Sequence, residues 1–148
     1  RLAPVAAGPD RLWGDRERGF VGRADGGGTA GGFGVYEGPI ITAAGRLGVP
    51  LEDLGGQEPR GIVQRVRSGE AVMVWVGLSD GPYGSWRSPT GRDVTVNFGE
   101  HAVVLTGVTA DGRLQVINPL EGTREIWTPQ QFSNGWRLLG RRAVAIAA

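Results

Sequence analysis

The sequence predicts an α+β domain in which short helices precede an antiparallel sheet. Two observations lead to this prediction. Apolar residues recur at helical spacing before residue 70, and from residue 71 onward they form short strand-sized runs separated by turn residues. Helices followed by hairpin-linked strands are typical of the α+β class. The 148 residues suit a single domain, which we divide into 1–34, 35–70 and 71–148.

The first part of the chain, residues 1–34, is rich in Gly and Pro and is predicted to be an extended arm. The second part contains two short helices. Pro39 suits the first position of a helix that runs to residue 47, and Gly48 ends it. An apolar stripe predicts the second helix over residues 59–68.

The third part contains the predicted sheet. Residues 71–76 are an apolar, β-branched run, as in a strand that is buried on both faces. The pair Asp111-Gly112 is a good hairpin turn between strands at 101–108 and 113–118. The remaining predictions are a loop or irregular hairpin at 79–92, strands at 94–98, 124–127 and 143–147, and a helix over 129–139 that Thr128 caps.

Composition excludes several kinds of function. The net charge of +1 gives no electrostatic basis for binding nucleic acid, and no apolar run is long enough to predict a membrane span. All 16 basic residues are Arg, as expected of a GC-rich genome. Because the chain contains no Cys, it has no disulfide, no thiolate metal site and no thiol nucleophile of its own. No metal or cofactor is predicted.

The best candidates for chemistry are the single histidine, His101, and Asn118. Each lies at the end of its predicted strand that is farther from the hairpin turn, so the two side chains can meet across the strands. A His oriented by a neighbouring Asn or Asp is the base half of a nucleophilic site. The structural alternative is the more frequent one from spacing alone, because an Asn before Pro is usually a turn residue.

The loop before His101 adds two weaker candidates. Trp86 lies in a polar stretch close to His101 in sequence, and we consider it a candidate for the wall of a substrate cleft, although a core position is the more frequent role. Three serines of the same stretch could be imagined as substitute nucleophiles. Turn residues surround them and no helix begins there, which disfavours that role. They are Ser79, Ser85 and Ser88.

The blocks around these candidates resemble the bacteriocin-processing (double-glycine leader) cysteine peptidases of the papain-like superfamily. Residues 100–107 are similar to the family's histidine strand, and residues 116–120 to its "Val-Asn-Asp-Pro-Leu" element. Residues 19–22 and 69–76 are similar to blocks of a secreted branch of the family. The resemblance runs from about residue 13 to residue 147.

The resemblance implies a papain-like fold, peptide or protein substrates, His101 as general base and Asn118 as the residue that orients it. The family usually has Asp at this second position. Its nucleophilic Cys and oxyanion Gln lie on a helix before the block at residues 19–22. Only 18 residues precede Gly19 here and none is Cys or Gln, so we expect that helix to be missing from this chain.

Three hypotheses follow from that expectation. The chain is part of an active cysteine peptidase whose thiol comes from an N-terminal segment or a second chain. Alternatively, it is an inactive pseudopeptidase that binds peptides, or a structural or assembly domain. The localisation stays open, and the resemblance favours a secreted or cell-envelope protein of a GC-rich bacterium.

Overall fold

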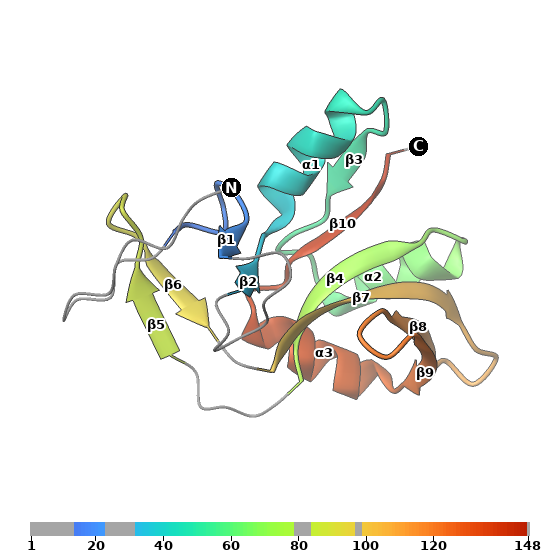
Figure 1. Cartoon of the computed structure of the whole chain (residues 1–148). Helices are drawn as coiled ribbons and strands as arrows, with labels where there is room; N and C mark the ends of the chain where they lie inside the picture. Colours follow the sequence, from blue (N-terminus) through green and yellow to red (C-terminus); the bar gives the residue numbers. More distant parts are fainter. Residues whose placement is uncertain (1–13, 23–31, 79–83, 97–98, 148) are drawn as a thin grey trace.

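The computed structural model describes residues 14–22, 32–78, 84–96 and 99–147 (Figure 1). Its main layer is a six-stranded sheet in which every neighbouring pair is antiparallel. In spatial order the strands are β3 (Leu51–Asp53), β10 (Ala143–Ile146), β4 (Val72–Gly77), β7 (Glu100–Val108), β8 (Leu114–Asn118) and β9 (Thr123–Trp127). The predicted α+β class, an antiparallel sheet with short helices, is confirmed.

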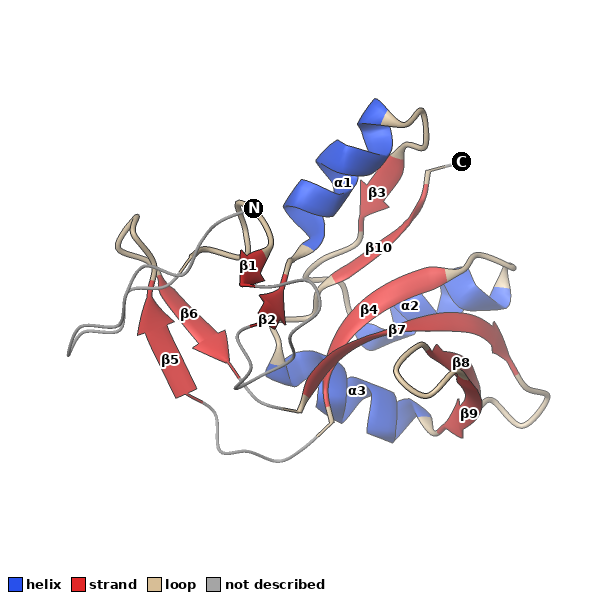
Figure 2. Ribbon diagram, in the orientation of Figure 1, coloured by secondary structure: helices blue, strands red, loops and turns tan. Residues whose placement is uncertain are grey.

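Helices cover both faces of this sheet (Figure 2). On one face, α2 (Pro59–Arg67) and α3 (Pro129–Leu138) close the main core. Their apolar stripes supply four fully or almost fully buried side chains: Ile62, Val66, Phe132 and Trp136. On the other face, α1 (Glu37–Arg46) lies over β3 and β10, and none of its residues is fully buried. The sheet is therefore packed more tightly on the α2 and α3 face.

The register of the central strands places the candidate residues. Val76 of β4 is opposite His101 of β7, and the side chains of such a pair share a face of the sheet. Along β7 and β8, Leu105 is opposite Val116, and both belong to the main core. Because side chains alternate along a strand, His101 and Asn118 lie on this same core face, beyond the apolar residues.

The remaining strands form a smaller part of the molecule, which we call the small lobe and define as residues 14–22, 32–34 and 84–96. It contains β1 (Val21–Gly22) paired with β2 (Gly32–Gly34), and β5 (Gly84–Arg87) paired with β6 (Asp93–Val96). Figure 1 shows β1 and β2 near the start of α1, with β5 and β6 farther from the helix. The apolar residues of the lobe form a cluster of their own: Val21, Trp86 and Val94, with Phe33 packed against them.

The structure differs from the sequence-based expectation in two places. The described part of the predicted arm, within 1–34, is anchored, because Asp15 and Arg16 are buried and two short strands form. The three-residue β3 lies within the part predicted to be helical. Each difference depends on partners that are distant in the sequence. For 79–92, predicted as a loop or an irregular hairpin, the described part from residue 84 forms the hairpin, with β5 and its turn before β6. The ends of the other elements lie within two residues of those predicted, except that the predicted end of the strand 94–98 lies outside the described residues.

None of the helices in the described ranges combines the length and the apolar character needed to cross a bilayer. No trio of His, Asp or Glu side chains in these ranges is arranged so that it could hold a metal ion.

Candidate active site

The structure brings His101 and Asn118 together. His101 Nε2 lies 2.8 Å from Asn118 Oδ1, which is a good hydrogen-bond distance. His101 is the second residue of β7 and is half-buried, and Asn118 is the last residue of β8 and is 7% exposed. The positions of the two strand ends predicted that His101 and Asn118 can meet, and in the structure their side chains are in contact.

The orientation of the Asn118 amide is determined by its other contacts. Its Nδ2 donates to Glu125 Oε1 at 2.8 Å, and its Oδ1 accepts from the backbone N–H of Leu120 at 3.1 Å. With Oδ1 facing the imidazole, the proton of the neutral ring must be on Nε2, because a carbonyl oxygen only accepts. Nδ1 then carries the free lone pair. A base that takes a proton from a nucleophile needs this arrangement.

Glu125 is a member of this site that the sequence analysis did not identify. Its carboxylate accepts from Asn118, from Trp127 Nε1 at 2.7 Å and from the Thr123 hydroxyl at 3.2 Å. These hydrogen bonds, that from Asn118 first, lower the pKa of Glu125 below its ordinary value. The three β9 residues alternate at i, i+2 and i+4, so they share a face. Their register against Asn118 is the signal that could have found Glu125.

A buried cation joins the small lobe to the strand that carries His101. Arg16 is 1% exposed and forms an ion pair with Glu100, the residue before His101. Its guanidinium also donates to the carbonyl oxygens of Thr95 and Phe33. It lies over the ring of Tyr36, 4.2 Å from the centroid. The lobe is thus attached directly next to the candidate base.

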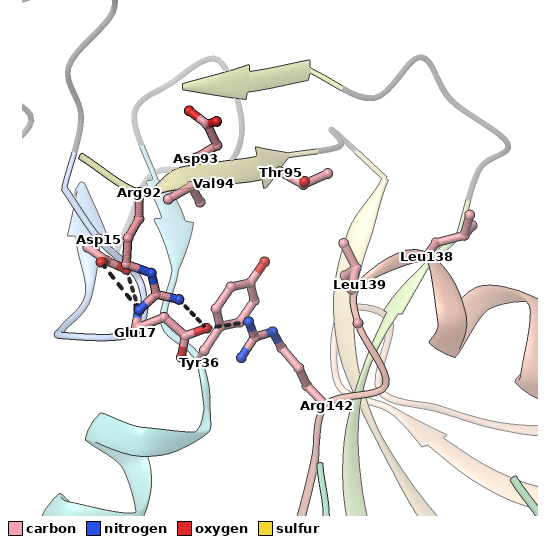
Figure 3. Close-up of a pocket in the computed structure, with 11 residues that line it drawn as sticks. Asp15, Glu17, Tyr36, Arg92, Asp93, Val94, Thr95, Leu138, Leu139 and Arg142 are labelled. Atoms are coloured by element: carbon pink, nitrogen blue, oxygen red, sulfur yellow. Dashed lines mark hydrogen bonds and ion pairs between the residues drawn. The ribbon is translucent and has the colours of Figure 1, made fainter. Parts of the chain in front are cut away.

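A cavity of about 170 Å³ lies between the small lobe and the start of β10 (Figure 3). The Tyr36 side chain points into it, and the Arg142 guanidinium also lies over the Tyr36 ring, 3.7 Å from the centroid. Burial raises the pKa of Tyr36 to about 12, so its hydroxyl stays protonated above pH 10, where an exposed tyrosine ionises. Tyr36 packs on Trp75, and the neighbouring Val76 shares a face with His101. The cavity therefore lies on the sheet face opposite to His101.

The weaker candidates are placed as follows. Trp86 is 6% exposed, donates its Nε1 to the Gly14 carbonyl oxygen at 3.0 Å, and packs edge-on against Phe33. Its role in a substrate cleft stays a prediction, and most of its ring surface is already in contact with the lobe. Ser88 is buried in a turn and bonded to Thr90, in keeping with a turn role; Ser79 lies outside the described residues.

Comparison with known proteins supports the fold. No family model matches the sequence, and no curated protein matches it. Among solved structures, the chain is similar to a crystal structure from Bacillus anthracis of a protein provisionally named a C39-like peptidase, with a TM-score of 0.81 and 24% identity. The similarity covers 99% of this chain and 74% of that one. The chain accordingly has the fold of that C39-like peptidase.

Proposed function

We propose that this chain is the base-and-orienter part of a papain-like cysteine peptidase domain. The observation that carries the proposal is the 2.8 Å contact from His101 Nε2 to Asn118 Oδ1, on a fold shared with a C39-like peptidase. The contact leaves Nδ1 as the proton acceptor. None of the 148 residues is Cys, so the thiol must come from outside this sequence.

In the proposed reaction, His101 Nδ1 takes the proton of that thiol, and the thiolate attacks the carbonyl carbon of a peptide bond. The imidazolium then returns the proton to the leaving amine nitrogen as the C–N bond breaks, which leaves a thioester. In the second half, His101 takes a proton from water as its oxygen attacks the thioester carbon. The C–S bond then breaks to release the carboxylic acid product, and the imidazolium returns its proton to the sulfur. The hydrogen bond from His101 Nε2 to Asn118 Oδ1 keeps the imidazole in the same orientation through both halves of the reaction.

The test uses the full polypeptide that the gene encodes, including any residues before Arg1, beside the 148-residue chain. We expect the full polypeptide to contain a Cys, to cleave peptides from a mixed pool analysed by mass spectrometry, and to react rapidly with iodoacetamide. His101→Ala should lower both rates by about 10²-fold or more, as for loss of a general base. Arg124→Ala, on the exposed side of β9, is the control and should leave both rates unchanged.

Two results would overturn the proposal. One is a full polypeptide without a Cys. The other is a Cys whose alkylation and peptide cleavage are the same with and without the imidazole of His101. Peptide cleavage by the 148-residue chain alone would instead refute the requirement for an external thiol.

The absence of Cys also favours a second candidate, a peptide-binding pseudopeptidase. In that case the full polypeptide would bind peptides in a titration, and the bound peptides would be recovered intact after prolonged incubation. Cleavage decides for the first candidate, and binding without cleavage decides for the second.

A further inference from the structure

We propose that Glu125 is a positioning residue that holds the Asn118 amide in one orientation and so selects the tautomer of His101 in which Nδ1 is unprotonated. The proposal rests on the proposed role of His101 as a base, because that role gives the tautomer its importance. It concerns groups that the sequence pattern did not connect. Glu125 lies seven residues after Asn118, on the next strand.

The contacts around Asn118 divide into two kinds. Its Oδ1 faces two groups that can donate, His101 Nε2 and the Leu120 N–H. Its Nδ2 faces a carboxylate oxygen of Glu125, which can only accept. A flipped amide would direct its NH₂ group at the Leu120 N–H and its oxygen at a negative charge. Both new contacts are repulsive, so the observed orientation is strongly preferred.

Burial makes this preference effective. Asn118 is 7% exposed, so little water can satisfy a wrongly oriented amide. Glu125 is itself held by Trp127 Nε1 at 2.7 Å and by the Thr123 hydroxyl at 3.2 Å. These donors keep the carboxylate ionised at neutral pH, in agreement with its lowered pKa. The negative charge of the site is thus on Glu125, which contacts Asn118, and Asn118 in turn contacts His101.

A glutamine at this position cannot replace the carboxylate. Its amide has one acceptor and one donor end, whereas the two main neighbours, Asn118 Nδ2 and Trp127 Nε1, both donate. If the introduced glutamine accepts from Trp127, its NH₂ group faces Asn118, and the Asn118 amide flips. The NH₂ of Asn118 then donates to His101 Nε2, and the ring proton moves to Nδ1.

The experiment is ¹⁵N NMR of the imidazole in the 148-residue chain, over a pH series from which the spectra of the neutral ring are used. Because His101 is the single histidine, one imidazole spin system reports the tautomer directly. We expect the Nε2–H form in the wild type. Glu125→Gln should shift the tautomer ratio at least ~10-fold toward Nδ1–H, since hydrogen bonds to charged groups are the strong ones.

Two matched variants make the test specific. Glu121→Gln removes the same charge from the exposed turn between β8 and β9, and the tautomer should not change. The double variant Asn118→Asp with Glu125→Gln exchanges the two functional groups. Its aspartate accepts from His101, from the Leu120 N–H and from the glutamine amide, while the glutamine oxygen accepts from Trp127. It should restore the Nε2–H tautomer.

A wild-type tautomer ratio in a folded Glu125→Gln chain would overturn the proposal, and so would an equal shift in Glu121→Gln. If the NMR spectrum of Glu125→Gln shows that this variant does not fold, the test uses the double variant Asn118→Asp with Glu125→Gln instead. Restored folding with the Nε2–H tautomer supports the proposal, and any other result overturns it. No thiol is present in this experiment, so failure of the proposed peptidase function leaves its outcome unaffected.

Discussion

The six-stranded sheet and the small lobe differ in the interactions that stabilise each of them. The interior of the sheet is a continuous apolar cluster, in which 14 side chains from strands, helices and one loop are at most 2% exposed. The small lobe has three buried apolar residues and a buried cation, Arg16, in contact with Tyr36, Trp86 and Glu100. Apolar burial stabilises the fold in proportion to the buried area. A buried ion pair adds little net stability, but removing one partner is costly because it leaves the other charge buried and uncompensated.

This difference predicts how each part responds to damage. Removing a large side chain from the sheet core should weaken the whole sheet, because the cluster is shared by the strands, α2 and α3. Removal of the lobe's cation should instead release the lobe from β7 and leave the sheet folded. His101 belongs to the sheet, although the residue before it is the lobe's anchor.

Trp136→Ala has the largest expected effect. Trp136 is fully buried, stacks on Phe132 at 5.1 Å and donates to the Arg142 carbonyl oxygen at 2.8 Å. The cavity and the lost contacts should lower the free energy of unfolding by about 4 kcal/mol. Urea unfolding followed by far-UV circular dichroism measures this loss. Ile126→Ala, at a 46% exposed position, is the control and should cost less than about 1 kcal/mol.

Arg16→Met should have a smaller and local effect. The Met side chain fills similar space but removes the guanidinium that pairs with Glu100 and donates to the Thr95 carbonyl oxygen. Breaking a buried pair in this way costs about 3 kcal/mol. Hydrogen exchange should show lost protection in the paired strands β5 and β6, while the amides of β4 and β7 stay protected. A uniform loss over both parts would contradict the proposed division.

The features that the sequence predicted are those encoded by local pattern. The apolar run at 71–76 became β4, and the Asp111-Gly112 turn placed His101 and Asn118 at corresponding strand ends. The features that it missed depend on distant partners. Arg16 pairs with a residue 84 positions later, and Glu125 meets Asn118 through the register of β8 and β9. Hydrophobic periodicity carries no information about either contact, because both are made by polar groups.

Tyr36, which contacts Arg16 of the small lobe and packs on the sheet beside Trp75, should make the protein sensitive to alkaline pH. Burial raises the pKa of Tyr36 from its ordinary value of 10.0 to about 12. Between these values the unfolded chain loses the phenol proton and the folded chain keeps it, so stability is complete below pH 10 and falls as pH rises. By about pH 11 the loss should be about 1 kcal/mol.

Few other side chains titrate in this pH range, because the chain has no Lys and no Cys, and Tyr36 and Tyr83 are its only tyrosines. Arg stays protonated throughout. Urea unfolding at about pH 9 and about pH 11 should therefore show the loss in the wild type and in Tyr83→Phe, and not in Tyr36→Phe. An equal loss in Tyr36→Phe would show that another group is responsible. It would also mean that the Tyr36 ring, between its two guanidiniums, is not as shielded from water as its 6% exposure indicates.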